Sequence, residues 1–144
     1  MKYKKNLFKL DNQNENLTGD AFNGAWLHGA NFASATLTDA SFIDCELTNA
    51  IFVYGILVRT NFQESILVGA SFSYTDLTEA NLSYTDLTGT DFVRAKMRGV
   101  NLCGAYLDKC NLRTADLTDA IYDNETVWPE KFDPKKAGAI KKLG

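Results

Sequence analysis

Histidine is nearly absent from this chain of 144 residues, in which His28 is the only one. A Ser–His–Asp triad and a histidine-based metal site both need histidine at a set distance from its partners, so neither is expected. His28 directly follows Leu27 and is expected to face the solvent. The acidic residues are scattered along uniform repeats with no inserted loop to form a cleft. The sequence therefore predicts no catalytic residue, no cofactor and no metal site.

Cysteine and long apolar runs are also scarce. The chain has three cysteines, an odd number, and their spacing is typical of neither a disulfide framework nor a metal site. No apolar run approaches the length of about 18 residues that a membrane span needs. The basic start of the chain has no apolar stretch of signal-peptide length. We therefore expect a cytoplasmic protein that does not insert into a membrane.

Basic residues are sparse in the middle of the chain. Residues 15–122 carry 13 acidic and six basic side chains, whereas residues 1–14 carry four lysines and one aspartate. Residues 123–144 carry five lysines and four acidic side chains, and the whole chain has a net charge of −3. Direct binding of nucleic acid is not expected, because phosphate contacts need an excess of lysine and arginine.

What the sequence does have is a large apolar residue at every fifth position. From Leu17 to Tyr122 this period holds for 22 consecutive residues, of which 13 are leucine and seven are phenylalanine. A small residue, most often alanine, stands two places before most of them, and asparagine or aspartate often stands directly before. The predicted structural core consists of Phe22, Leu27, Phe32, Leu37, Phe42, Leu47, Phe52, Leu57, Phe62, Leu67, Phe72 and Leu77.

A five-residue period fits neither an α-helix nor a flat strand. In a helix, a step of five residues rotates by about 140° and spreads the apolar residues around the axis. In a strand, an odd step changes the face. The period is satisfied if the chain turns the same way every five residues and stacks coil on coil, as a solenoid. Phenylalanine and leucine alternate from Phe22 to Leu77, so a coil of four sides and 20 residues would stack like on like.

The repeated triplets Ala-Asn-Phe, Ala-Asn-Leu and Ala-Asp-Leu resemble the pentapeptide-repeat family. The resemblance covers residues 15–122 and implies an all-β fold, the right-handed quadrilateral β-helix, with about five and a half coils here. Residues 120–139 are similar to the C-terminal ends of cyanobacterial members.

Both ends of such a solenoid need a cap, because the core is otherwise exposed there. The period divides the chain into an N-terminal cap segment (1–14), a pentapeptide-repeat β-solenoid (15–122) and a C-terminal cap and tail (123–144). The residues expected to plug the first coil are Leu7, Phe8 and Leu10. Trp128 and Phe132 are expected to fold back over the last coil as the C-terminal cap. An aromatic ligand pocket is the less favoured interpretation of these two residues.

The surface most typical of a binding site is expected on the second and third coils. Outward positions there hold large apolar residues, whereas elsewhere they are mostly Thr, Ser, Asn, Asp or Gly. The candidate partner surface consists of Ile51, Val53, Tyr54, Ile56, Val58, Ile66 and Val68. Exposed apolar patches often mark contact sites, and the hypothesis is a protein-contact or self-association face. β-branched residues also suit strand-like walls, so a purely structural interpretation stands beside it.

Outward residues 20 apart are expected to lie above one another. Two columns stand out: Ser34, Tyr54, Tyr74, Arg94 and Thr114, and Asp76, Lys96 and Asp116. The first predicts two stacked tyrosine rings beneath an arginine, in a cation–π arrangement. The second predicts a ladder of surface ion pairs, which adds little stability.

The cysteines fall at two kinds of position in the repeat. Cys45 and Cys110 take the small inward position, where cysteine acts as a slightly larger alanine. Cys103 follows a large residue and is expected to face outward.

Fold and surface together favour a non-enzymatic repeat scaffold that acts through protein–protein contacts, with weak self-association as a further expectation. The alternative is implied by the resemblance, since some pentapeptide-repeat proteins resemble duplex DNA in width and charge and bind DNA gyrase. The acid excess of residues 15–122 agrees with such a DNA mimic. Three features favour the scaffold instead: basic residues interrupt the acids, no loop interrupts the repeats, and the two prolines of the tail break any long dimerising helix.

Overall fold

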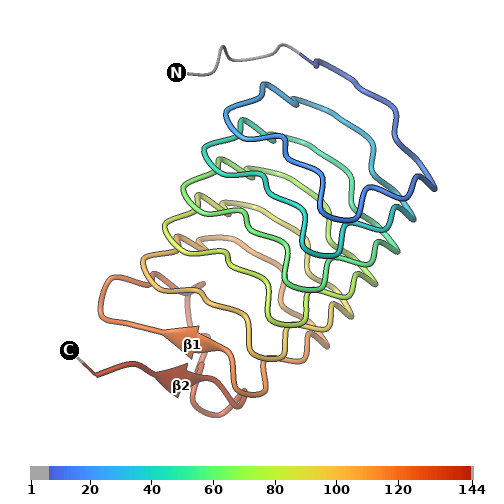
Figure 1. Ribbon diagram of the computed structural model, residues 1–144. Helices are drawn as coiled ribbons and strands as arrows, with labels where there is room; N and C mark the ends of the chain where they lie inside the picture. The colour runs from blue at the N-terminus through green and yellow to red at the C-terminus, as the bar shows by residue number, and fades with distance from the viewer. Residues whose placement is uncertain (1–6, 144) are drawn as a thin grey trace.

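The computed structural model describes residues 7–143, which wind into a four-sided rod that begins at one end with the first described residues and finishes at the other with β2 (Ile140–Lys141) (Figure 1). Isolated parallel bridges, from Asp11↔Asn31 to Asn101↔Ile121, join residues 20 apart and stack one coil on the next. The regular strands are β1 (Ile121–Tyr122) and β2 (Ile140–Lys141), which pair in parallel. Within the described residues there is no helix long and apolar enough to cross a membrane.

Each corner of the coil is a tight turn. The N–H of the fourth residue donates to the carbonyl of the first, as from Ala35 to Phe32 at 3.0 Å. The third residue, at every fifth position from Lys9 to Asp119, has φ between 55° and 74°, as in a type II turn. This left-handed conformation disfavours residues with a side chain by about 1–2 kcal/mol. At Gly104 a side chain is also excluded by space, because the ring of Tyr84 lies where the Cβ would be.

Stacked phenylalanine rings fill the middle of the rod. On one wall Phe22, Phe42 and Phe62 stack with centroid separations of 4.7 and 5.1 Å. On the opposite wall Phe32, Phe52, Phe72 and Phe92 stack at 5.2, 4.8 and 5.3 Å. Rings from the two walls meet edge to face at 5.4–5.9 Å. Like therefore stacks on like, as the alternation of phenylalanine and leucine predicted.

From Leu27 to Leu77 the leucines line the other two walls, and these six have no exposed area. The predicted core phenylalanines are also fully buried, with one exception. Phe22 is half-buried and packs against the core from the first coil, where fewer residues cover it.

Polar side chains at the small inward position are satisfied by the coil below. Thr60, Thr75 and Thr90 are buried, and each hydroxyl donates at 2.8 Å to the carbonyl of the large residue 23 places earlier. The thiols of Cys45 and Cys110 make the same contact at 3.1 and 2.8 Å. The inward placement predicted for these two cysteines is confirmed, and the hydrogen bonds allow polar residues in an otherwise apolar core.

Cys103 lies outside the core cluster and faces outward as predicted, but it is covered, since only 7% of this residue is exposed. The Asp123 carboxylate above it folds down to accept a hydrogen bond from the Gly104 N–H at 3.0 Å. Burial, with the nearby Asp123 carboxylate, raises the pKa of the Cys103 thiol. A short side chain between taller neighbours is covered by them although it points away from the core.

At the N-terminal end, the expected plug forms only in part. Residues 1–6 of the predicted cap segment lie outside the described residues, and residues 7–14 already follow the path of the coil. Leu7 and Leu10 pack against the core. The plug role expected for Phe8 is wrong, because Phe8 is 57% exposed and its ring stacks on His28 at 5.5 Å. It follows Leu7 directly, and that position points outward in every repeat.

At the C-terminal end, the five-residue period stops at a one-residue insertion. Val127 bridges Tyr106, 21 residues earlier instead of 20. The extra residue is held in a loop in which Asp123 accepts hydrogen bonds from the N–H groups of Glu125 and Thr126. Beyond it the tail makes one more, irregular turn of the rod, since β2 pairs with β1 and the Gly138 carbonyl accepts from the Asp119 N–H.

Candidate functional site

The candidate partner surface divides into two parts. Ile51 and Val53 lie on one side of the rod, Ile56 and Val58 on the next, and Tyr54 at the corner between them. We call these five residues the 51–58 patch. Ile66 and Val68 lie on the side before Ile51, since Ile66 bridges Glu46 below and Asp86 above. The structure thus brings five of the seven predicted residues together around one corner and leaves two on a neighbouring side.

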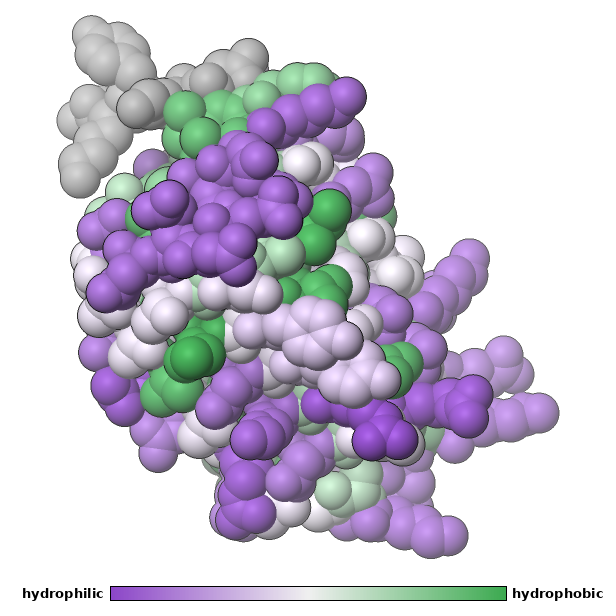
Figure 2. Space-filling view, turned by 90° about the vertical axis from the view of Figure 1, so that its right-hand side faces the viewer, coloured by the Kyte–Doolittle hydropathy of each residue, from purple (hydrophilic) through white to green (hydrophobic). Residues whose placement is uncertain are grey.

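The isoleucines of this surface are exposed and its valines are half-buried. Ile51, Ile56 and Ile66 are 37%, 47% and 43% exposed, and Tyr54 is 62% exposed. On the face drawn in Figure 2, hydrophobic residues form small separate areas among polar ones rather than a continuous apolar surface. An apolar area of this kind suits a limited contact better than a large permanent interface.

The isoleucines stand at a position where about half of the repeats have asparagine or aspartate. At that position, directly before the large residue, the side chain accepts a hydrogen bond from the N–H two residues on, in an Asx turn. Such turns are made by Asp11, Asn16, Asn31, Asn61, Asp76, Asn81, Asp86, Asp91, Asn101, Asn111 and Asp116. Isoleucine cannot accept, and within residues 7–143 the N–H groups of Val53, Val58 and Val68 have no hydrogen-bond partner.

Beside the 51–58 patch, the predicted column of aromatic rings is confirmed. The rings of Tyr54 and Tyr74 stack with centroids 5.2 Å apart. The Arg94 guanidinium lies 6.0 Å from the Tyr74 centroid, within the range of a cation–π contact. The stack holds three long side chains in order along one corner of the rod.

An open groove runs between this stack and the next side of the rod. The Tyr54–Tyr74–Arg94 stack forms one wall and the column Ile56, Asp76 and Lys96 forms the other. Gly55 and Thr75 complete the lining, and the volume is about 400 Å³. The groove is apolar at Ile56 and carries two cations, Arg94 and Lys96, at the end nearer the C-terminus. We call it the Tyr–Lys groove.

In the predicted ladder of ion pairs, Lys96 pairs with neither Asp76 nor Asp116 among the described residues, and the one pair of this set that forms is Arg98–Asp116. Asp76 accepts from the N–H and the hydroxyl of Thr78 at 3.0 and 2.6 Å, which turns its carboxylate along its own coil. Among the described residues Lys96 forms no ion pair. Asp116 makes the same Asx turn with Thr118, which lowers the pKa of its carboxyl, and its other oxygen lies 3.7 Å from Arg98.

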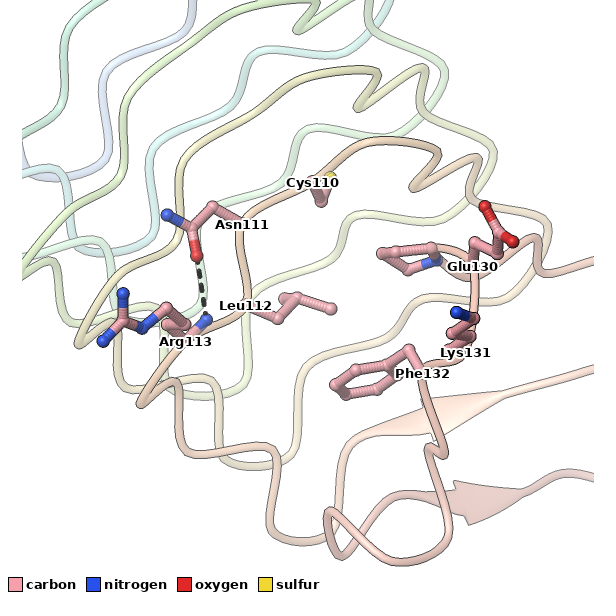
Figure 3. A pocket seen from close by; sticks show the side chains of 8 residues that line it. Cys110, Asn111, Leu112, Arg113, Glu130, Lys131 and Phe132 are labelled. Atoms are coloured by element: carbon pink, nitrogen blue, oxygen red, sulfur yellow. Dashed lines mark hydrogen bonds between the residues drawn. The ribbon is translucent and has the colours of Figure 1, made fainter.

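A second hollow lies between the last regular coil and the tail (Figure 3). Its volume is about 340 Å³, and it is lined by Cys110, Asn111, Leu112, Arg113, Pro129, Glu130, Lys131 and Phe132. In Figure 3 the Leu112 and Phe132 side chains point toward each other across it, whereas Arg113 points away. Burial raises the pKa of the Cys110 thiol to about 12, so this group stays protonated at neutral pH and is no nucleophile.

Trp128 and Phe132 lie at the C-terminal end of the rod. Both are half-buried and pack against the core cluster. Trp128 meets Tyr122 edge to face at 5.4 Å and stacks on Phe132 at 5.2 Å. No cluster of three or more His, Cys, Asp or Glu side chains in the described part of the chain is arranged to hold a metal ion.

The chain belongs to the pentapeptide-repeat family, whose fold is the right-handed quadrilateral β-helix. The family model for pentapeptide repeats matches residues 16–52, 56–94 and 95–121, with eight copies. Together these segments cover most of the coil, and the match agrees with the four-sided winding and the 20-residue bridges.

Similar solved structures include other pentapeptide repeat proteins. Rfr23 from the cyanobacterium Cyanothece 51142 is 24% identical, with 85% of this chain and 90% of that chain covered and a TM-score of 0.46. A protein from the Arabidopsis thaliana thylakoid lumen is 28% identical (78% and 68% covered, TM-score 0.48). QnrB1, a plasmid-mediated fluoroquinolone resistance protein, is 22% identical (94% and 78% covered, TM-score 0.47). A sequence comparison with curated proteins finds no match.

Proposed function

We propose that the protein is a non-enzymatic scaffold that binds another protein through the 51–58 patch together with Ile66 and Val68. The observation that carries this proposal is the isoleucine at positions 51, 56 and 66. Each isoleucine forgoes a hydrogen bond that Asn or Asp makes at the same position elsewhere in the coil, and each exposes apolar surface. The lost hydrogen bond and the exposed apolar surface both disfavour the rod when it is alone in solution. A partner protein that covers this surface explains why isoleucine is present there.

The chemistry of the remaining side chains supports a role without catalysis. His28 stacks on Phe8 and makes no hydrogen bond to an acidic group among the described residues. The Cys110 thiol is held protonated. Nucleophilic and general acid–base catalysis both need a group whose pKa lies near neutral beside a partner that activates it. We also propose a cytoplasmic location, which the free thiols of Cys103 and Cys110 support, because a reducing compartment preserves thiols.

The triple variant Ile51→Asn, Ile56→Asn and Ile66→Asn tests the contact surface. It installs three Asx turns, each of which adds about 0.5–1.5 kcal/mol of hydrogen bonding, and removes the exposed apolar groups. We expect an unchanged circular dichroism spectrum, an equal or higher melting temperature, and loss of the partner protein in affinity capture from the native cell. Sedimentation velocity of wild type and variant measures self-association through the same surface.

A matched control tests whether loss of the partner comes from the position of the substitutions or from the introduction of asparagine as such. The double variant Ala21→Asn and Tyr106→Asn makes the same kind of change at equivalent positions outside the patch, Ala21 on the fourth side of the rod and Tyr106 two coils above Ile66. It is expected to keep the partner. If the triple variant captures the same protein as wild type and has the same sedimentation coefficient, the contact surface lies elsewhere and the proposal fails.

The acid excess of residues 15–122 favours the DNA mimic as a second candidate function. Four basic residues on two adjoining sides (Arg94, Lys96, Arg98 and Arg113) interrupt the negative surface and favour the scaffold. We expect no inhibition of DNA gyrase in a supercoiling assay at micromolar protein, and no protection of the enzyme against quinolones. Inhibition or protection at that concentration would instead establish the mimic.

A further inference from the structure

We infer that the Tyr–Lys groove binds an extended acidic segment of the partner, with an apolar side chain against Tyr54 and Ile56 and a carboxylate against Arg94 and Lys96. This inference rests on the proposed function, because the groove shares Tyr54 and Ile56 with the 51–58 patch. It adds the chemistry of the partner, which the apolar patch alone does not specify.

The distribution of charge supports an acidic ligand. The rod as a whole is acidic, yet on the two sides and the corner around the groove, residues 71–118 carry four bases and three acids. The bases are Arg94, Lys96, Arg98 and Arg113, and the acids are Asp76, Asp91 and Asp116. A local positive area on an acidic molecule favours an anionic segment there and disfavours it over the rest of the surface.

The cations of the groove are available, whereas the acids are engaged. Within residues 7–143, neither Arg94 nor Lys96 lies within ion-pair distance of a carboxylate. Asp76, the acid of the groove wall, accepts from both the N–H and the hydroxyl of Thr78. Asp91 accepts from the Val93 N–H in the same way. The two cations therefore have no internal carboxylate to displace when a carboxylate of the ligand binds.

The groove also restricts the position of the ligand. Adjacent coils lie about 4.8 Å apart, so Ile56 and Lys96, two coils apart, are separated by roughly 10 Å along the rod. An extended chain rises about 3.3 Å per residue, so a segment along the rod covers this distance in about three residues. The stacked Tyr54 and Tyr74 rings form a flat wall beside such a segment. An apolar residue and an acidic residue about three positions apart fit the groove.

The probe is an end-capped, fluorescein-labelled peptide of alternating leucine and glutamate, compared with its glutamine and lysine analogues. Fluorescence anisotropy measures binding to the full chain. We expect saturable binding of the glutamate peptide that weakens as salt is raised, about tenfold weaker binding of the glutamine analogue, and none of the lysine analogue. In NMR spectra the amide shifts are expected to centre on residues 54–56, 74–76 and 94–96.

The double variant Arg94→Gln and Lys96→Gln should weaken binding of the glutamate peptide about tenfold. The control Lys109→Gln and Lys136→Gln removes the same charge elsewhere on the exposed surface and should bind as wild type. Equal affinity for the glutamate and glutamine peptides, or wild-type affinity of the Arg94/Lys96 variant, would overturn the inference. So would tighter binding of a single-stranded oligothymidine than of the peptide.

Capture of the native partner separates this inference from the proposed function. A partner lost from the Ile51/Ile56/Ile66 variant and also from the Arg94/Lys96 variant supports both. If the partner is lost from the Ile51/Ile56/Ile66 variant but retained by the Arg94/Lys96 variant, the contact surface is supported and the binding of an acidic segment is refuted. A partner retained by both refutes the contact surface itself.

Discussion

Phe52→Ala is expected to lower the free energy of unfolding by about 3–5 kcal/mol, the cost of removing a fully buried aromatic ring. Phe52 has no exposed area and stacks between Phe32 at 5.2 Å and Phe72 at 4.8 Å. Two rings of the opposite wall also meet its edge. Because the corners above and below are held by hydrogen bonds, the coil cannot close over the space, and a cavity remains. Urea unfolding followed by circular dichroism measures the change.

Phe22→Ala is the control for this prediction. Phe22 makes the same kind of contacts, with Phe42 at 4.7 Å and Phe32 at 5.6 Å, but it lies in the first coil and is half-buried. Its removal should cost less than half as much, because the end of the rod can relax around it. Equal losses at Phe22 and Phe52 would show that stability does not depend on depth within the stack.

The second large effect is expected at the C-terminal end. The double variant Trp128→Ala and Phe132→Ala removes two half-buried rings from the end of the core and should cost about 2–4 kcal/mol, less than two fully buried rings would. Tyr122, which meets Trp128 edge to face, becomes exposed in the process. We expect faster amide exchange at Leu107 and Tyr122 and a lower urea midpoint, because an uncapped solenoid frays from its end.

Phe8→Ala is the matched control, since it removes an aromatic ring that is 57% exposed and stacks on His28. Its effect should stay within about 0.5 kcal/mol of wild type, as for most surface substitutions. If the Trp128/Phe132 variant lowers the free energy of unfolding by no more than Phe8→Ala does, Trp128 and Phe132 do not cap the rod.

The regular part of this fold could be predicted because each residue's place depends on a single period. A step of five residues sets which side chains point inward, and a step of 20 sets which of them stack. The Tyr54–Tyr74–Arg94 stack follows from that arithmetic alone. The candidate groove could have been found in the same way, by reading the column of Ile56, Asp76 and Lys96 beside it.

The five-residue period does not specify the hydrogen-bond geometry within one repeat. The frequent Asn and Asp before each large residue were visible in the sequence, but their role as Asx turns depends on the distance to the N–H two residues on. The Asp76–Lys96–Asp116 ladder failed for that reason, since the turn directs the carboxylate away from the lysine. Cys103 is covered because Asp123 bends over it, beyond the last regular repeat. The one-residue insertion before Val127 likewise follows from local hydrogen bonds.

The hydrogen bonds between coils all join residues about one coil apart, such as the Leu7 N–H to the Trp26 carbonyl and the Phe72 N–H to the Asp91 carbonyl. Uniformly short connections of this kind let a chain fold in the order of its synthesis. Each 20 residues that leave the ribosome can dock on the coil already formed, without waiting for a distant segment. We expect the newest phenylalanines and leucines at the growing end to stay exposed until the following residues dock on them.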